Sequence, residues 1–263
     1  MVQGWQKTIW PDAHLNKTDP GPAGEVGRAD VTAYVKRAAG NIGQLKWMNK
    51  PMLTYLTVPV TPYQQNCSLL WCDQSMKAAV LDPGGDLELV LAQVTRLGLT
   101  LEQIWLTHGH IDHAGAAAEL SLAFKLPIIG PHQADQFLID SLALQGKMFG
   151  MAQAQSFKPT RWLSDGDTVN VGQSSLLVRH CPGHTPGHVV FYSNQAKRAF
   201  VGDVLFAGSI GRTDLPQGDH ATLIASIKQR LWPMGDDTVF IPGHGPESTF
   251  GIERRSNPYV RDA

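Results

Sequence analysis

Cysteine is scarce in this chain, because only three cysteines occur among 263 residues, and they share no repeat spacing: Cys67, Cys72 and Cys181. We therefore expect no structural disulfide, and a reducing, cytoplasmic location fits this composition. No apolar run is long enough to cross a bilayer, so no membrane partner is expected. Residues 1–20 also lack the apolar core of a secretory signal.

Long runs of one charge are also missing. Lys and Arg together number 22, Asp and Glu 23, and the formal net charge is −1. A nucleic acid or an anionic membrane surface therefore finds no global electrostatic attraction, and neither is expected as a partner. With 43% hydrophobic residues, the chain can bury the core of one domain of ordinary size.

The first fifty residues differ in composition from the rest. Residues 11–30 are rich in proline and glycine and show almost no apolar periodicity, so they bury too little surface to offset chain entropy. We predict that residues 1–51 form a loosely attached, poorly structured extension and that residues 52–263 form the folded domain. Met48 and Met52 are alternative candidates for the start of translation.

From Leu53 onward, short apolar or β-branched segments alternate with segments of helical periodicity. Strands are expected at 53–60, 67–72, 78–81, 101–107, 127–129, 168–171, 175–181, 189–192, 199–201 and 238–241. Helices are expected at 87–97, 114–124 and 221–231, with a helical or loop insertion at 133–158 and a short tail after residue 247. Two strand-rich stretches, each followed by helices, predict an α+β fold with two sheets packed face to face and helices outside.

Residues 108–113 read His-Gly-His-Ile-Asp-His and follow an apolar run that is typical of a buried strand. Three imidazoles and a carboxylate within six positions are typical of a metal site. The alternative is a solvated, histidine-rich turn. The pattern favours a metal site at the end of this strand.

Three further donors stand beside Gly or Pro after other expected strands: His184, Asp203 and His244. Their side chains can converge at one sheet edge, where glycine allows close backbone approach. Taken singly, each histidine equally fits a hydrogen-bonded turn. Together with the 108–113 cluster they give five imidazoles and two carboxylates, which suits two metals that share a carboxylate. Nitrogen and oxygen donors without thiolate favour zinc, with iron or manganese as alternatives.

The motif at 107–113, followed in order by His184, Asp203 and His244, resembles the metallo-β-lactamase superfamily over about residues 53–256. The resemblance implies an αββα sandwich with two metals at one edge of the sheets. Asp203 would bridge the metals, and the other ligands would be His108, His110 and His184 for the first and Asp112, His113 and His244 for the second. Members that hydrolyse antibiotics often carry Cys where this chain has Asp203, so that activity is not expected.

Within this superfamily the chain is similar to the glyoxalase II group, most closely to its short YcbL-type bacterial branch. The likeness rests on three stretches: Leu81–Gly85, Pro182–His188 and Gly211–Asp214. Full-length glyoxalase II enzymes have an additional helical domain that binds glutathione. Residues 245–263 contain no visible counterpart of the basic residues of that domain. The resemblance implies hydrolysis of a small-molecule thioester such as S-D-lactoylglutathione, by a monomer or small homo-oligomer.

Two dications a few ångströms apart would lower the pKa of a shared water toward neutrality, and the metal-bound hydroxide would attack the thioester carbonyl. Asp112 and Asp203 are then the catalytic carboxylates, and no Ser or Cys nucleophile is needed. Cys181 is expected to be a buried apolar residue.

Four residues near the predicted ligands have supporting roles in this interpretation. Asp82, at a Pro-Gly-Gly turn, either orients a ligating imidazole or bonds its own turn. Arg212 and Asp214 either contact a substrate carboxylate or pair with each other. His188 is interpreted as a strand-start residue outside the metal set.

Other functions are compatible with parts of this pattern. A persulfide dioxygenase with a single iron belongs to the same superfamily and fits Gly211–Asp214, and hydrolysis of other small esters or lactones would use the same donors. A non-catalytic binding module is disfavoured because all seven donors are present. A nuclease is disfavoured by the balanced charge.

Overall fold

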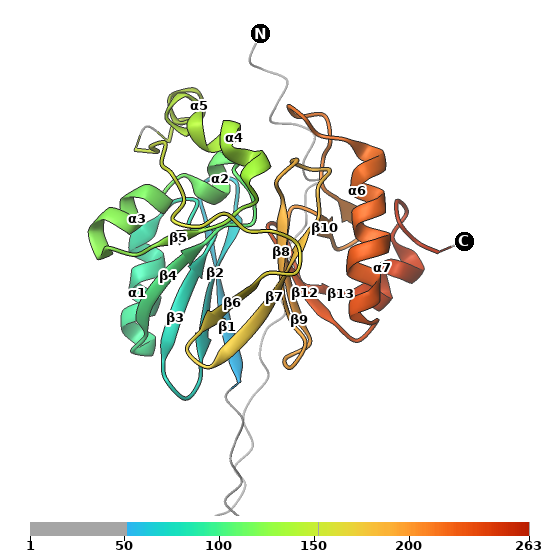
Figure 1. Ribbon diagram of the computed structural model, residues 1–263, viewed down its shortest axis with the longest axis horizontal. Helices are drawn as coiled ribbons and strands as arrows, with labels where there is room; N and C mark the ends of the chain where they lie inside the picture. Colours follow the sequence, from blue (N-terminus) through green and yellow to red (C-terminus); the bar gives the residue numbers. More distant parts are fainter. Residues whose placement is uncertain (1–51, 152, 263) are drawn as a thin grey trace, which may run out of the picture. The chain divides into compact units, whose positions relative to one another are not determined.

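Two large β-sheets, a two-stranded hairpin and two groups of helices make up residues 52–151 and 153–262, which are the residues described by this computed structural model (Figure 1). The predicted extension, residues 1–51, lies outside the described residues. The helices α1 (Leu87–Leu97), α2 (Ile111–Ala114), α3 (Ala117–Phe124), α4 (Gln136–Asp140) and α5 (Leu142–Phe149) lie on the side of the first sheet. On the side of the second sheet lie α6 (His220–Ser226) and α7 (Phe250–Ser256).

The first sheet has the spatial order β1-β2-β3-β4-β5. Its strands are β1 (Leu53–Val60), β2 (Gln65–Cys72), β3 (Lys77–Leu81), β4 (Thr100–Trp105) and β5 (Ile128–Ile129). The first three run antiparallel, whereas β3–β4 and β4–β5 pair in parallel. Parallel neighbours need a crossover, and α1 (Leu87–Leu97) provides the first one.

The second sheet has the order β13-β12-β9-β8-β7-β6. Its strands are β6 (Thr168–Val171), β7 (Ser174–His180), β8 (Val189–Ser193), β9 (Arg198–Gly202), β12 (Val239–Pro242) and β13 (Ser248–Thr249). Only β9 and β12 pair in parallel, and the chain crosses between them through α6 (His220–Ser226), a π-helical turn (Ile227–Leu231) and a 3-10 turn (Trp232–Met234).

Three hydrophobic cores separate the four layers. Leu69 of β2 belongs to the core under α1 and α3, whereas its neighbour Leu70 belongs to the core between the sheets. On β8, Phe191 lies in the core between the sheets and Val190 in the core under α6 and α7. Successive strand residues point to opposite faces, so central strands with a covered face on each side are apolar throughout. The predicted αββα fold is confirmed.

Three predicted elements differ in detail. The helix expected at 114–124 is two helices, α2 (Ile111–Ala114) and α3 (Ala117–Phe124), because the Ala116 amide donates to the Pro83 carbonyl, 3.0 Å away, instead of continuing the helix. The insertion contains a 3-10 turn (Gln133–Asp135), α4 (Gln136–Asp140) and α5 (Leu142–Phe149). The short tail holds β13 and α7 (Phe250–Ser256).

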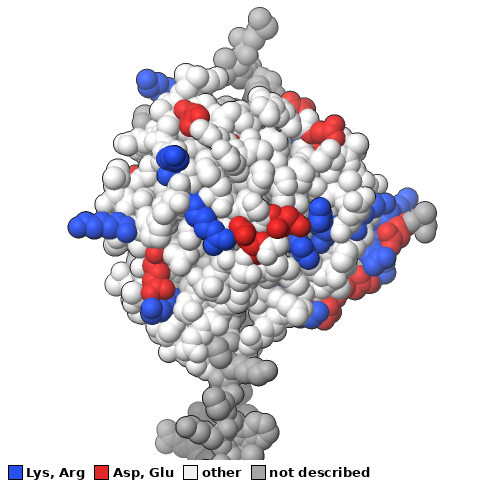
Figure 2. All heavy atoms as spheres, viewed as in Figure 1, with Lys and Arg blue, Asp and Glu red and all other residues white. Residues whose placement is uncertain are grey.

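Two expectations about membranes and thiols can be compared with the structure. No helix among the described residues is long and apolar enough to cross a membrane. All three cysteines are unpaired and buried, as expected for Cys181. Figure 2 shows Lys and Arg interspersed with Asp and Glu on the face that it presents.

Candidate metal centre

The seven predicted donors come together at one edge of the sandwich. They follow the ends of β4, β7, β9 and β12, so four chain segments that are far apart in sequence meet there. Asp112 and His113 lie on the short helix α2, directly after the β4 loop. The donors can be grouped into three triads, in each of which the candidate ligand atoms lie within 4.8 Å of one another.

The first group contains three imidazoles that approach one another through their ring nitrogens. His110 Nδ1 lies 3.1 Å from His108 Nε2 and 3.0 Å from His184 Nε2. A tetrahedral zinc with Zn–N distances of about 2.0–2.1 Å separates its nitrogen ligands by about 3.3 Å. The spacing of these three nitrogens is therefore close to that of one metal shell.

The second group lies beside the first and includes a carboxylate. His244 Nε2 lies 3.2 Å from Asp112 Oδ2, and His113 Nε2 lies 3.9 Å from the same oxygen. Asp203 stands between the groups: its Oδ1 is 3.3 Å from His113 Nε2, and its Oδ2 is 3.6 Å from His184 Nε2. The carboxylate thus faces both groups.

In four imidazoles, the nitrogen that points away from the donor groups donates a hydrogen bond to a nearby acceptor. This contact determines the tautomer of each ring. His184 Nδ1 donates to the Arg212 carbonyl at 2.8 Å, and His244 Nδ1 donates to the Tyr63 carbonyl at 3.1 Å. His113 Nδ1 donates to Asp82. His108 Nδ1 donates to Thr107 Oγ1, because the Thr107 hydroxyl proton is already directed at Asp82. When each ring is neutral, its Nε2 keeps a free lone pair toward the group.

Asp82 is buried at the end of β3, and its carboxylate accepts hydrogen bonds from two neighbouring segments. Its Oδ1 accepts from the Thr107 amide at 2.7 Å, and its Oδ2 accepts from the Thr107 hydroxyl at 2.7 Å and from His113 Nδ1 at 2.9 Å. Of the two interpretations of Asp82, the contact with a predicted ligand is therefore the one observed.

Burial and mutual repulsion keep the first group uncharged. Burial lowers the pKa of His108 well below its ordinary value, and the neighbouring imidazoles lower it further. Burial and His184 lower the pKa of His110 to about 3. In contrast, burial would raise the pKa of Asp203, but His113 and His244 outweigh it and hold that pKa well below its usual range. The first group thus presents neutral imidazoles and Asp203 an anionic carboxylate, the forms that bind metals.

Two atoms of the cluster show directly that a cation fits. Among the described residues, His113 Nε2 and Asp203 Oδ1 are buried without any hydrogen-bond partner. A buried lone pair without a donor is costly, and a cation between these atoms would satisfy both. Together with the donor chemistry and spacing, this shows that the residues present fit one or two divalent ions.

Three features of the site left no clear signal in the sequence. His188, placed outside the ligand set, stacks on His108 with ring centroids 4.7 Å apart and accepts the Asp203 amide at Nε2, 3.0 Å away. Asp135 is buried behind the 108–110 loop. Phe206, from the hairpin of β10 (Leu205–Phe206) and β11 (Ser209–Ile210), lies 6.3 Å from His244 between ring centroids.

Arg212 and Asp214 are near the cluster through the backbone. The guanidinium of Arg212 donates two hydrogen bonds to the carboxylate of Asp214, at 2.7 and 2.6 Å. This mutual pairing is one of the two alternatives for these residues, and it fixes the loop whose carbonyl receives His184 Nδ1.

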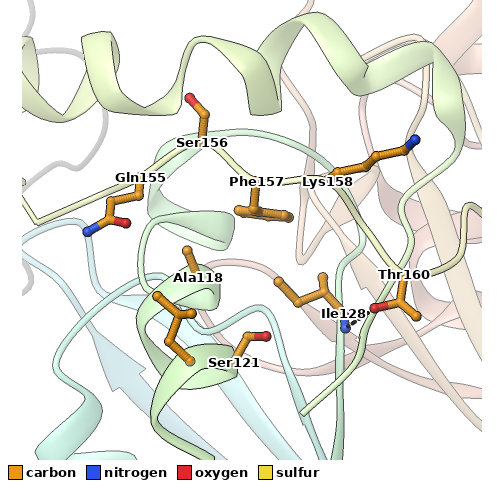
Figure 3. A pocket seen from close by; sticks show the side chains of 9 residues that line it. Ala118, Ser121, Ile128, Gln155, Ser156, Phe157, Lys158 and Thr160 are labelled. Atoms are coloured by element: carbon orange, nitrogen blue, oxygen red, sulfur yellow. Dashed lines mark hydrogen bonds between the residues drawn. The ribbon is translucent and has the colours of Figure 1, made fainter. Parts of the chain in front are cut away.

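A separate hollow of about 210 Å³ lies between α3 and residues 155–160 (Figure 3). Phe157 and Ile128 line its apolar part, and Lys158 and Thr160 stand at its side. None of the residues that line it is one of the seven donors, so this hollow is not part of the candidate metal centre.

Comparison with known proteins agrees with the fold. The family model described as the metallo-beta-lactamase superfamily matches residues 60–244. Hydroxyacylglutathione hydrolase GloC of Haemophilus influenzae (strain ATCC 51907 / DSM 11121 / KW20 / Rd) is 46% identical over 204 residues, which are 77% of this chain and 96% of that protein.

Two solved structures share the fold at substantial identity. The crystal structure of TTHA1623 in a di-iron-bound form has 39% identity and a TM-score of 0.71, covering 78% of this chain and 100% of that one. The crystal structure of BLEG-1 B3 metallo-beta-lactamase has 34% identity and a TM-score of 0.73, covering 80% and 100%.

The αββα sandwich and its cluster of histidines and aspartates define a metallohydrolase fold with a site for divalent metals. The chain belongs to the metallo-β-lactamase superfamily, and the predicted family is confirmed. Its similarity to a hydroxyacylglutathione hydrolase supports a hydrolase of the glyoxalase II type.

Proposed function

We propose that this protein is a binuclear metal-dependent hydrolase that cleaves a hydroxyacylglutathione thioester such as S-D-lactoylglutathione. The observation that carries the proposal is the position of Asp203, whose carboxylate faces His113 with one oxygen and His184 and His244 with the other. A carboxylate that lies between two groups of donors can bind both metals of a binuclear site. The 46% identity to a hydroxyacylglutathione hydrolase supports the choice of substrate.

Each donor group would hold one ion, with Asp203 common to both. When bound, two divalent ions supply Lewis acidity, which lowers the pKa of water and stabilises negative charge on a carbonyl oxygen. We propose zinc, and the di-iron form of a similar protein supports iron as the alternative. The ligands would be His108, His110 and His184 on one side, and Asp112, His113 and His244 on the other.

The residues of the chain orient the reaction around this centre. Asp112 has a side chain that is 21% exposed, so its carboxylate reaches both the donor group and solvent, and we assign it to orient the attacking water and accept its proton. Asp82 would keep His113 in the ligating tautomer. No Ser or Cys nucleophile is required, and burial raises the pKa of the Cys181 thiol to about 12, which disfavours its thiolate.

The substrate would lie at the open side of the cluster. Phe206, beside His244, offers an apolar wall. Arg212 is proposed as a contact for a substrate carboxylate, in which case its pairing with Asp214 presents the guanidinium in a fixed position. We further propose a cytoplasmic location, supported by the three unpaired cysteines, and a monomer or small homo-oligomer.

A steady-state assay of the metal-loaded protein on S-D-lactoylglutathione tests the proposal. We expect turnover in the wild type and a loss greater than about 100-fold in Asp203→Asn, because even partners outside the metal ligands often contribute about 10–100-fold. Asp140→Asn is the matched control, because Asp140 is an exposed residue at the end of α4.

Further assays on the same preparation separate the alternatives. Elemental analysis that finds two ions per chain supports the binuclear hydrolase. One iron per chain with oxygen uptake on a persulfide would replace it with the dioxygenase. Hydrolysis of nitrocefin without thioester turnover would favour the β-lactamase activity named for the BLEG-1 structure. Hydrolysis confined to simple esters or lactones would overturn the thioester assignment.

A further inference from the structure

Asp135 is a buried charged residue that the proposed chemistry does not use. It ends the 3-10 turn Gln133–Asp135 and its side chain is excluded from solvent. Within the part of the chain that the structure describes, Asp135 forms no ion pair with a basic residue. A buried carboxylate without a cation costs several kcal/mol in general, so its hydrogen bonds must offset that cost.

Among the described residues, the hydrogen bonds to the Asp135 carboxylate come from the two loops that carry the first donor group. Its Oδ2 accepts from the Gly109 amide at 2.9 Å and from the Thr185 hydroxyl at 2.8 Å, and its Oδ1 accepts from the Gly187 amide at 2.5 Å. Gly109 stands between His108 and His110, and Thr185 follows His184. One carboxylate therefore joins the loop with two of the imidazoles to the loop with the third.

The two glycines keep the space that this contact needs. A Cβ atom at Gly187 would lie 2.6 Å from both the amide nitrogen and Oδ1 of Asp135. A Cβ atom at Gly109 would lie 2.8 Å from Leu138 Cβ, on the helix that follows Asp135. A side chain does not fit at either glycine without a shift of its neighbours. The backbones of both loops therefore pack closely against the Asp135 segment and have little space to move relative to it.

We propose that Asp135 is a positioning residue that sets the spacing of His108, His110 and His184 and thereby the affinity for the first of the two metal ions. The inference rests on the proposed binuclear function. It predicts a selective effect, because the second group is oriented by other partners: Asp82 accepts from His113, and the Tyr63 carbonyl accepts from His244.

Titration of the metal-free protein with Co²⁺ alone, followed by its visible absorption, tests the proposal. We expect two equivalents to bind to the wild type. Asp135→Asn preserves size but turns one acceptor into an amide donor that faces an N–H or O–H group. The Asp135→Asn variant should bind one equivalent of Co²⁺ as tightly as the wild type does and the other about 10–100-fold more weakly. Asp140→Asn, only five residues away on the exposed surface, should behave as the wild type does.

Variants of Thr185 keep the test decisive if Asp135→Asn does not fold. Thr185→Val keeps the volume but removes one of the three donors, so it should weaken the same equivalent, and Thr185→Ser should restore its affinity. Equal weakening of both equivalents, or two tight equivalents in Asp135→Asn, would overturn the inference. A wild type that binds two ions and hydrolyses no thioester would overturn the proposed function alone.

Discussion

His113 Nδ1 lies 2.9 Å from Asp82 Oδ2, and both side chains are buried. Asp82 has a positive φ of 52°, a conformation that Asp and Asn tolerate better than other residues with a Cβ. Its two hydrogen bonds from Thr107 leave it only one orientation, in which it accepts the imidazole proton. The contact therefore fixes the tautomer that exposes His113 Nε2 to Asp203.

The substitution Asp82→Asn should lower the affinity for one of the two metal ions by about 10–100-fold. The asparagine keeps the backbone conformation, but its amide nitrogen would face a donor at either Thr107 or His113. His113 can relieve that conflict only by moving its proton to Nε2, which removes the ligand. Titration of the metal-free variant with Co²⁺ should show that the equivalent spared in Asp135→Asn is now the more weakened one, because Asp82 contacts His113 directly and His108 only through Thr107. If the same equivalent is the more weakened one in both variants, the assignment of Asp82 to the second group is wrong.

Gly84→Ala should destabilise the protein more than Gly85→Ala does. A Cβ at Gly84 would lie 1.6 Å from the carbonyl oxygen of Asp112, so α2 would have to move. A Cβ at Gly85 would meet the methyl group of the Thr61 side chain at 2.9 Å and no backbone atom within 4 Å. Since overpacking a tight site costs about 1–3 kcal/mol, we expect at least about 2 kcal/mol for Gly84→Ala. Urea unfolding of both metal-free variants measures this, and equal values would contradict the predicted clash.

The four layers could be predicted because the central strands have a strong local pattern. Leu69 and Leu70 are successive and both buried, so the run reads as a strand covered on both faces. The helix α7 could not be predicted in the same way. The buried polar residues Glu253, within the helix, and Asn257, at its C-cap, hold it through hydrogen bonds rather than an apolar stripe.

That the seven candidate donors meet at one place could be predicted, because imidazole and carboxylate side chains mark metal-binding chemistry by their residue type alone. Asp135 and His188 could not, because their role comes from tertiary contacts with backbone amides: Gly109 and Gly187 for Asp135, and Asp203 for His188. A backbone donor leaves no trace in the residue type of its partner. Such contacts become visible only when the loops are placed in space.

Metal binding at pH 7 should release protons from the protein. Burial lowers the pKa of His113, but Asp203 and Asp112 outweigh it and raise that pKa well above its ordinary value. His244 behaves similarly, because the same carboxylates raise its pKa against the effect of burial. Both imidazoles must lose their proton to bind a metal, so we expect about one or more protons released per chain.

The sign of the associated stability change follows from these raised pKa values. Protonated His113 and His244 stabilise the metal-free protein fully below about pH 6.5, and that contribution is lost as the pH rises through their folded-state pKa values. Metal affinity rises over the same range, so the stability of the loaded protein relative to the metal-free protein should increase as the pH rises above about 6.5. Calorimetry in buffers of different ionisation enthalpy measures the protons. His220→Gln, an exposed control, should match the wild type, and His244→Gln should release fewer.

Glu253→Gln should destabilise the protein and loosen the hairpin that carries Phe206. Glu253 is buried, and it accepts hydrogen bonds from the Gly208 amide at 2.8 Å, the Asn257 amide group at 2.9 Å and the Ser248 hydroxyl at 2.5 Å. Gly208 lies in the turn between β10 and β11. The glutamine amide would face one of these donors, and an unsatisfied buried group costs about 1–3 kcal/mol.

Urea unfolding of Glu253→Gln measures this cost, with Glu88→Gln on the exposed side of α1 as the control, which should change stability by less than about 0.5 kcal/mol. Since Phe206 borders His244, the hairpin change should raise KM for the thioester more than it lowers kcat. Equal stabilities of the two variants would show that Glu253 does not hold the hairpin. A fall in kcat with KM unchanged would show that Phe206 does not contact the bound substrate.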